Sequence, residues 1–366
     1  MVPTLDLQIT IRGKLQIPKN CVPKRPGRIT AKIMRFPLSM SMRIGSYVAR
    51  KKLSGAKKYP MVLMLEPLHA CNLTCTGCGR IREYDTHIKE RLSIQDCLDS
   101  VDECEAPVVS ICGGEPLIYP GIGELTAKIL ERGKVVYLCT NGMFIRKKIG
   151  EFKPSNRFFW NVHLDGLKAS HDLAVERDGV YDEAIDGIKC AKEQGFLVCS
   201  NTTVFTETDM GELDQLFTHL TSLGVDGFMI APGYEYSAVA VREIFLNREM
   251  IRFKFKQAEA MFKKHKFNTS PIYLEFLQGK REMQCTAWAS PTRNIAGWKG
   301  PCYLITDIHH KSYNDLINNT NWEEYGYGKD PRCENCMSHV GYEVAAAVGV
   351  NGKLGDTFKM IAWQFL

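Results

Sequence analysis

The stretch Cys71-Asn72-Leu73-Thr74-Cys75-Thr76-Gly77-Cys78 carries the pattern on which the fold and the chemistry of this chain depend. Its CxxxCxxC spacing lets Cys71, Cys75 and Cys78 wrap three thiolates around one face of an iron–sulfur cubane. A fourth protein ligand would close such a site, whereas three leave one iron open to a substrate or cofactor. Histidines flank the loop, so a zinc site is the alternative. The loop therefore predicts a catalytic metal centre.

The sequence around this loop alternates short apolar runs with helical patterns from Met61 onward. Such alternation is typical of repeated β-α units and a parallel sheet. The predicted strands are residues 62–68, 108–112, 135–139, 158–164, 197–204 and 227–231, and the predicted helices are 93–104, 123–132, 144–152, 181–194 and 211–223. Six such units predict an α/β fold, either an open sheet or a partial (β/α)6 barrel. Ligands are expected at the carboxyl ends of its strands.

The cysteine loop, directly after the first predicted strand, resembles that of the radical S-adenosylmethionine (SAM) superfamily. There the amino and carboxylate groups of SAM chelate the fourth iron of a [4Fe-4S] cluster, and an electron cleaves SAM to a 5′-deoxyadenosyl radical. The resemblance implies a radical SAM barrel with both cofactors here, and Cys71, Cys75 and Cys78 as the cluster ligands.

The second predicted strand ends in Cys112-Gly113-Gly114-Glu115-Pro116, which looks like the GGE motif of that superfamily. The resemblance implies that Gly113 and Gly114 let the backbone approach the methionyl group of SAM, and that Glu115 accepts from its ammonium. Any β-α turn favours glycine, so an ordinary turn is the alternative. The position one unit after the cysteine loop favours cofactor binding.

The ends of later predicted strands offer four polar side chains, Asn141, His163, Asp165 and Asn201. Because the carboxyl ends of parallel strands meet at one edge of the sheet, we expect these residues to line the ribose and adenine of SAM and the substrate. Taken singly, each is also compatible with a turn residue that hydrogen-bonds its own backbone.

Beyond residue 280 the β-α repeat stops, and little helix or strand pattern remains. Cys285, Cys302, Cys333 and Cys336 occur there, and the stretch 285–302 resembles the start of the auxiliary-cluster (SPASM or twitch) domains of many radical SAM enzymes. The resemblance implies a second iron–sulfur cluster in a small cysteine-containing extension. Four thiolates suit zinc as well. If no metal binds, these cysteines are ordinary buried thiols.

Positive charge is concentrated at the start of the chain. Residues 1–60 hold fourteen Lys or Arg and one acidic residue, a charge of +13, so the total of +6 leaves −7 for the remainder. Residues 37–53 predict an amphipathic helix with Leu38, Met42, Val48 and Leu53 on one side. This helix either rests on a membrane surface or packs against the following domain. Few aromatic residues interleave with the basic ones, so no nucleic-acid partner is expected.

The overall composition is that of a globular protein, with 366 residues of which 45% are hydrophobic. It predicts a basic arm with an amphipathic helix at 1–58, a core at 59–235 and a helical, cysteine-containing region at 236–366. We see neither a membrane-spanning run nor a signal peptide and expect a cytoplasmic protein, with peripheral contact at the inner membrane surface. In that reducing compartment clustered cysteines are better metal ligands than disulfides.

A closer resemblance covers the chain from about Ser41 to about Ala347. Residues 59–68, 101–104, 137–141, 162–166, 245–249, 285–288, 291–294 and 301–304 resemble the adenosylhopane synthases of hopanoid biosynthesis. The resemblance implies a transferase that forms a C–C bond by adding the 5′-deoxyadenosyl radical to the terminal alkene of diploptene. It implies a hydrophobic polycyclic alkene as substrate and a reductant such as flavodoxin or ferredoxin. The chain departs from the family at Val340, where a further cysteine is expected.

Such an addition leaves a tertiary carbon radical that needs a hydrogen atom. Cys112, just before the GGE turn, is a thiol in a plausible place to donate it, and a small packed apolar residue is the alternative. Two other functions stay open. One is a radical SAM enzyme with an auxiliary cluster that modifies a peptide or another lipid by hydrogen abstraction, and the other is a non-catalytic metal- or nucleic-acid-binding protein.

Overall fold

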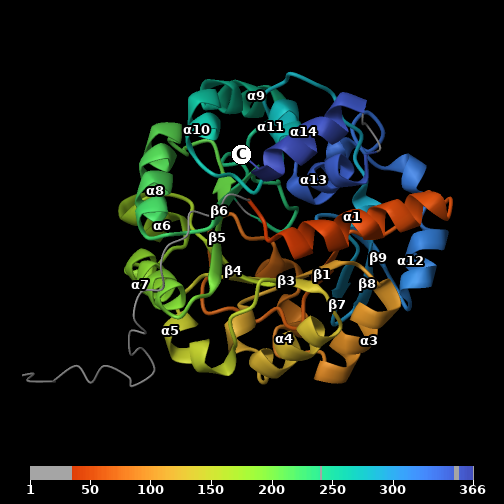
Figure 1. Cartoon of the computed structure of the whole chain (residues 1–366), viewed down its shortest axis with the longest axis horizontal. Coiled ribbons are helices and arrows are strands. Elements are labelled where there is room, and N and C mark those ends of the chain that lie inside the picture. Colours follow the sequence, from red (N-terminus) through yellow and green to blue (C-terminus); the bar gives the residue numbers. More distant parts are fainter. Residues whose placement is uncertain (1–34, 240, 350–353, 366) are drawn as a thin grey trace, which may run out of the picture.

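The computed structural model describes residues 35–239, 241–349 and 354–365. Within these ranges one sheet of nine strands runs in the order β6-β5-β4-β3-β2-β1-β7-β8-β9 (Figure 1). The strands are β1 (Val62–Leu65), β2 (Val108–Ile111), β3 (Val135–Thr140), β4 (Phe158–His163), β5 (Leu197–Val204), β6 (Gly227–Pro232), β7 (Thr292–Asn294), β8 (Gly297–Pro301) and β9 (Thr306–His310). Strands β1 to β7 pair in parallel, whereas β8 and β9 are antiparallel to their neighbours.

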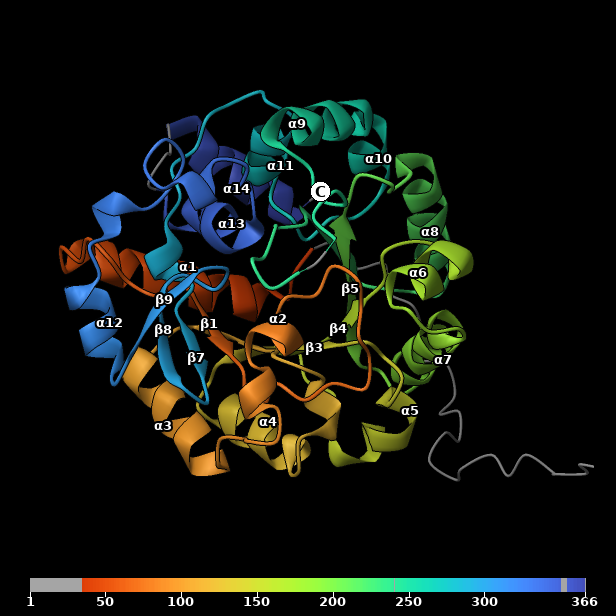
Figure 2. The same cartoon turned by 180° about the vertical axis from the view of Figure 1, so that it is seen from behind.

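Helices surround this curved sheet, as Figure 2 shows from the opposite side. They are α1 (Leu38–Leu53), α2 (Arg80–Glu83), α3 (Ile94–Cys104), α4 (Ile122–Glu131), α5 (Ile145–Lys148), α6 (Lys168–Ala174), α7 (Val180–Glu193), α8 (Met210–Ser222), α9 (Arg248–Gln257), α10 (Glu259–Lys264), α11 (Pro271–Leu277), α12 (Tyr313–Asn319), α13 (His339–Val348) and α14 (Leu354–Phe365). The predicted α/β partial barrel is confirmed.

The local sequence explains these elements. All four residues of β2 are buried, as expected for a parallel strand covered on both faces. Helix α3 begins with a capping box, in which Ser93 Oγ accepts from the Asp96 backbone at 3.0 Å and Asp96 accepts from the Ser93 backbone at 3.1 Å. Because β1 to β6 run in parallel, the loops that follow them lie at the same edge of the sheet.

Two expectations were wrong. The segment after residue 280 does contain regular structure, because β7 pairs with β1 and extends the sheet, and β8 and β9 follow it. The single helix expected at 144–152 is α5 followed by a 3-10 turn at Ile149–Glu151. Strands of three to five residues have too short an alternation to stand out in sequence, and their pairing partners are far away in the chain.

Helix α1 crosses the amino ends of the strands. Its buried residues are Met40, which packs with Val108 and Val135, and Tyr47. The apolar face predicted for it was wrong in part, because Val48 is half-buried whereas Leu38, Met42 and Leu53 are 52%, 65% and 89% exposed. The inner face therefore packs on the barrel, and separate apolar side chains point outward. The rest of the basic arm, residues 1–34, lies outside the described residues.

Helix α14 meets the start of α1. Gln364 Nε2 donates to the Phe36 carbonyl at 2.7 Å, and the Phe36 and Trp363 rings pack edge to face. The opposite side of α14 exposes Phe358, Ile361 and Phe365 by 73%, 54% and 54%. Within the described ranges, no helix has both the length and the apolar character needed to span a bilayer.

Candidate functional site

The cysteine loop that follows β1 is held by the GGE turn that follows β2. The Gly114 and Glu115 amides donate to the carbonyls of Leu68 and Ala70 at 3.1 and 2.9 Å. A Cβ atom at Gly113 would lie 2.3 Å from the Leu68 carbonyl oxygen, and one at Gly114 would lie 1.9 Å from the Ala70 oxygen. Only glycine allows this approach, so the turn forms a cradle for the start of the loop.

A cavity of about 300 Å3, here called the central cavity, opens at the carboxyl ends of β1 to β6. All the residues predicted from the core motifs and strand ends line it, namely Cys71, Cys75, Cys78, Cys112, Gly113, Gly114, Glu115, Asn141, His163, Asp165 and Asn201. The structure thus brings together side chains that are up to 130 positions apart in the sequence.

The three loop thiols have the chemistry of cluster ligands. Burial raises the pKa of Cys71 to about 11 and raises that of Cys75 further. Thiols in such an environment ionise when a metal binds them, since the metal supplies the positive charge. In the described part of the chain, no three His, Cys, Asp or Glu side chains converge on a single metal ion. A cubane does not require that convergence, because each thiolate binds a different iron. The donor set and the glycine cradle fit a three-ligand cluster.

Glu115 is fully buried at the wall of the central cavity. Its carboxylate accepts from the Thr140 hydroxyl at 2.8 Å and from the Leu117 and Asn141 amides at 2.9 Å. Burial outweighs these hydrogen bonds and raises the pKa of Glu115 to about 7. Asn141 in turn donates to Asn72 of the cysteine loop at 2.9 Å. A cationic ligand beside Glu115 would favour its ionised form.

His163 and Asp165 form an ion pair of 2.9 Å at the end of β4. Burial opposes protonation of His163, but Asp165 outweighs burial and raises the pKa of the imidazole. The second oxygen of Asp165 accepts from the Thr203 amide at 2.7 Å. Asn201 of β5 is in register with His163, so the polar groups of both strands face the same cavity.

Sequence reasoning missed a buried charged group next to the cysteine loop. Arg80 is 3% exposed and lies over the rings of Tyr303 and Tyr236, at 4.4 and 5.3 Å from their centroids. Its ion pairs go to Glu83 at 3.2 Å and Glu66 at 3.6 Å. The sequence carries no signal for this burial, because α2 is a single turn that reads as a solvated segment.

The ion pairs around Arg80 also connect the cysteine loop to the C-terminal region. Lys299 of β8 is 1% exposed and pairs with Glu83 at 3.0 Å. Burial and the neighbouring Arg80 charge lower the pKa of Lys299 to about 8. The C-terminal strands thus supply part of the wall behind the cysteine loop.

The four C-terminal cysteines line a second cavity of about 630 Å3, here called the four-cysteine cavity. Burial raises the pKa of all four thiols, Cys285, Cys302, Cys333 and Cys336. Tyr234, Leu304 and Val340 line both this cavity and the central cavity. The four thiols therefore share one space, separated from the central cavity by a wall of side chains.

Comparison with known proteins agrees with this geometry. Residues 65–220 match the radical SAM superfamily, and residues 228–360 match a domain of unknown function, DUF3463. AlbA of Bacillus subtilis, an antilisterial bacteriocin subtilosin biosynthesis protein, is 24% identical over 78% of this chain and 66% of its own length. The mycofactocin maturase MftC of Mycobacterium tuberculosis is 27% identical over 45% of this chain and 43% of its own length. The chain thus spans less than two thirds of either curated relative.

Among solved structures, Streptococcus suis SuiB bound to its precursor peptide SuiA superposes with a TM-score of 0.59. The match covers 80% of this chain and 73% of SuiB at 16% sequence identity, so it shows the fold alone.

The cysteine loop, its glycine cradle and the superfamily match together define the class of this part of the chain: residues 65–220 form a radical SAM domain. More particularly, the radical SAM domain is followed by a region that matches DUF3463, and the cofactors of a radical SAM domain are a [4Fe-4S] cluster and SAM. The match favours an enzyme over a non-catalytic binding protein. The relatives named above act in bacteriocin and mycofactocin biosynthesis, so the hopanoid assignment stays a prediction.

Proposed function

We propose that this enzyme forms a C–C bond between the 5′-deoxyadenosyl group and the terminal alkene carbon of diploptene, giving adenosylhopane for hopanoid biosynthesis. The observation that carries the proposal is the thiol of Cys112 in the wall of the central cavity, next to the GGE turn. The resemblance of residues from about 41 to about 347 to the adenosylhopane synthases supports the substrate.

When bound, a cluster reduced by one electron from a reductant such as flavodoxin or ferredoxin would cleave SAM, breaking a C–S bond and releasing methionine together with a 5′-deoxyadenosyl radical. Addition of that radical to the alkene forms one C–C bond and leaves an unpaired electron on the tertiary carbon of the substrate. Cys112 then donates a hydrogen atom, so its S–H bond breaks, a C–H bond forms and a thiyl remains. One electron from the same reductant, together with one proton, restores the thiol.

The surroundings of Cys112 suit a hydrogen-atom donor. The side chain is 7% exposed, and burial and the nearby Glu66 charge raise the pKa of its thiol. The raised pKa keeps the S–H bond intact at neutral pH, and only the protonated form holds a hydrogen atom to give. Tyr303, which also lines the central cavity, lies near this thiol and opposes part of the rise in its pKa.

The proposal is tested by an anaerobic assay of the reconstituted enzyme with SAM, dithionite and diploptene. Mass spectrometry follows both the adenosylated hydrocarbon and free 5′-deoxyadenosine. An adenosyl-hopane adduct supports the proposal. Free 5′-deoxyadenosine without an adduct contradicts it and leaves the radical SAM class in place.

The second candidate is modification of a peptide or another lipid by hydrogen abstraction, with an auxiliary cluster in the four-cysteine cavity. The four buried thiols in one cavity favour it, and so does the similarity to AlbA and SuiB. Hydrogen abstraction releases free 5′-deoxyadenosine in proportion to product. Adenosyl transfer instead keeps the nucleoside in the product, so no free 5′-deoxyadenosine is released. The fate of the nucleoside therefore separates the two candidates.

Peripheral contact with an anionic membrane surface is part of the proposal, because a pentacyclic hydrocarbon partitions into bilayers. Helix α14 exposes the apolar side chains of Phe358, Ile361 and Phe365. Helix α1, which meets α14 at Phe36, has four basic residues and no acidic one. Exposed apolar side chains beside positive charge match the surface of anionic lipid.

A further inference from the structure

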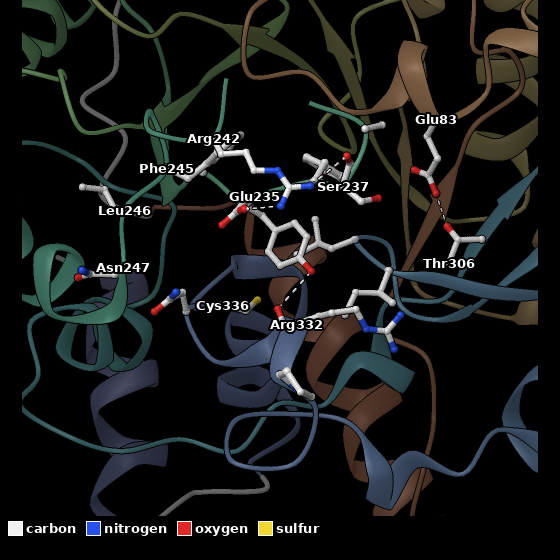
Figure 3. A pocket seen from close by; sticks show the side chains of 18 of the residues that line it. Glu83, Glu235, Ser237, Arg242, Phe245, Leu246, Asn247, Thr306, Arg332 and Cys336 are labelled. Carbon is white, nitrogen blue, oxygen red and sulfur yellow. Dashed lines mark hydrogen bonds and ion pairs between the residues drawn. The ribbon is translucent and has the colours of Figure 1, made fainter. Parts of the chain in front are cut away.

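A third cavity, here called the outer cavity and drawn in Figure 3, shares lining residues with the central cavity. Its volume is about 490 Å3, and it lies between the residues that follow β6 and the C-terminal segments 304–306 and 331–336. Gly233, Tyr234, Tyr236, Phe245 and Leu304 line both the outer and the central cavity. These five residues therefore lie between the two cavities.

Every charged side chain that lines the outer cavity already has a partner of opposite charge within the chain. Glu235 pairs with Arg242 at 3.2 Å, as Figure 3 shows, and Glu83 pairs with Lys299 at 3.0 Å. Arg332 pairs with both Asp307 and Asp330. Each charged side chain of the lining is therefore already engaged in an ion pair before a ligand binds.

The remaining lining is largely aromatic and aliphatic. Phe245, Leu246 and Ile305 are each less than a tenth exposed, and Met250 borders the cavity from α9. The ring of Tyr236 is fixed between the cavities, because it packs on the Gly79 backbone and against Arg80. The outer cavity thus combines these apolar side chains with at least as much polar surface, and its charged side chains already form ion pairs.

We infer that the outer cavity binds the body of a neutral, largely apolar substrate and directs its reacting end past Tyr236 into the central cavity. A charged ligand would have to break an existing ion pair or bury its charge without compensation, and both cost free energy. A neutral ligand keeps every ion pair and gains from apolar contact. The inference rests on the proposed function for the identity of the alkene and adds to it a location and a charge requirement.

The first test fills the cavity. Ala238 lines it from the segment after β6, so Ala238→Trp places an indole in the space of the substrate body. With diploptene in detergent micelles, the ratio of free 5′-deoxyadenosine to adduct should rise at least about tenfold over wild type. Ser222→Trp, at an exposed position of α8, is the matched control and should keep the wild-type ratio. A wild-type ratio in Ala238→Trp would overturn the inference.

The second test changes charge without filling space. Glu235→Gln removes the partner of Arg242 and leaves an unpaired guanidinium at the cavity. A triterpene carboxylic acid should then compete with diploptene at least about tenfold better than it does against wild type. Equal competition in both proteins would contradict the charge requirement. Because this variant is nearly isosteric, it also covers the case in which Ala238→Trp fails to fold.

The third test does not depend on turnover. A neutral triterpene alkene carrying an alkyl diazirine is photo-crosslinked to the reconstituted enzyme, and the labelled residues are mapped by mass spectrometry. Labels on residues 234–238, 242–250 or 304–306 support the site, and labels confined to other surfaces overturn it. If crosslinks fall in the outer cavity but no adduct forms in the assay, the proposed reaction has failed and the location stands.

Discussion

The ring of Tyr236 lies directly against the backbone of Gly79, where a Cβ atom would come within 2.3 Å of the ring carbon Cγ. Gly79 follows the third cysteine of the loop and has ordinary right-handed helical angles, so alanine there would be unstrained apart from this contact. We therefore expect Gly79→Ala to displace the loop and to lower iron incorporation after anaerobic reconstitution, measured as iron per chain and visible absorbance.

Removing the ring should reverse that defect. In the double variant Gly79→Ala/Tyr236→Gly the new methyl group meets neither the ring nor the Tyr236 Cβ, which would otherwise lie 2.6 Å away, so iron content should return toward the value of Tyr236→Gly alone. If the double variant loads no better than Gly79→Ala, the defect comes from the backbone and not from the contact.

The raised pKa of Glu115 predicts that SAM binding releases a proton near neutral pH. Burial raises that pKa from 4.5 to about 7, and the SAM ammonium would favour the carboxylate. Calorimetry in two buffers of different ionisation enthalpy measures the release. Glu115→Gln should abolish it and weaken SAM binding about tenfold or more. Glu90→Gln, at an exposed position, should change neither quantity.

The same shift has a consequence for stability. Because the folded-state pKa of Glu115 lies above its unfolded value, the folded protein binds more protons between pH 4.5 and about 7. The contribution of Glu115 to the free energy of unfolding therefore falls as pH rises through that window. Glu115→Gln should flatten this part of the stability curve, and an unchanged slope in urea unfolding would argue against the shift.

Cys112→Ala should separate addition from reduction. SAM consumption with diploptene should continue, while the yield of reduced adenosylhopane falls at least about tenfold. Because thiol hydrogens exchange with water, wild-type product formed in D2O should carry one deuterium at the former radical carbon. Cys104→Ala, a buried thiol on α3, is the control. Efficient reduction by Cys112→Ala would show that another donor serves.

The four-cysteine cavity predicts a second metal-dependent signal. Cys302→Ala/Cys336→Ala should lose about four iron atoms per chain, the content of one [4Fe-4S] cluster, while the loop cluster keeps its SAM-dependent spectrum. Loss of zinc instead of iron would identify a zinc site. Unchanged metal content in this variant would leave these cysteines as ordinary buried thiols.

The outward face of α14 predicts membrane binding through apolar contact. Phe358→Ser/Ile361→Ser/Phe365→Ser should reduce co-sedimentation with phosphatidylglycerol vesicles at least about tenfold, because each large apolar side chain contributes of order 1.5–3 kcal/mol when buried. Phe253→Ser, which is 62% exposed on α9, is the matched control. Equal binding of the triple variant would place the contact elsewhere.

The central cavity could be predicted because its signals are local. The cysteine spacing, the GGE turn and the polar strand ends each occupy a few consecutive residues, and parallel strands bring their carboxyl ends together whatever the loop lengths. Arg80 and Lys299 could not be predicted, because their burial depends on contacts between segments more than 200 positions apart. The outward side chains of α1 were missed in part because this helix carries apolar residues on more than one side. Met40 and Tyr47 pack on the barrel, which leaves Leu38 and Met42 exposed.

The pairing of β7 with β1 determines the order in which the site is completed. Strand β1 and its cysteine loop leave the ribosome early, yet the second neighbour of β1 is not available until residue 294 has been made. Until then β1 is an edge strand, and the loop lacks the wall that Lys299 and Tyr303 later provide. A chain shortened before residue 292 keeps the β1 edge open to strands of other molecules, so the C-terminal region, once it has folded, protects the finished barrel from edge-to-edge aggregation.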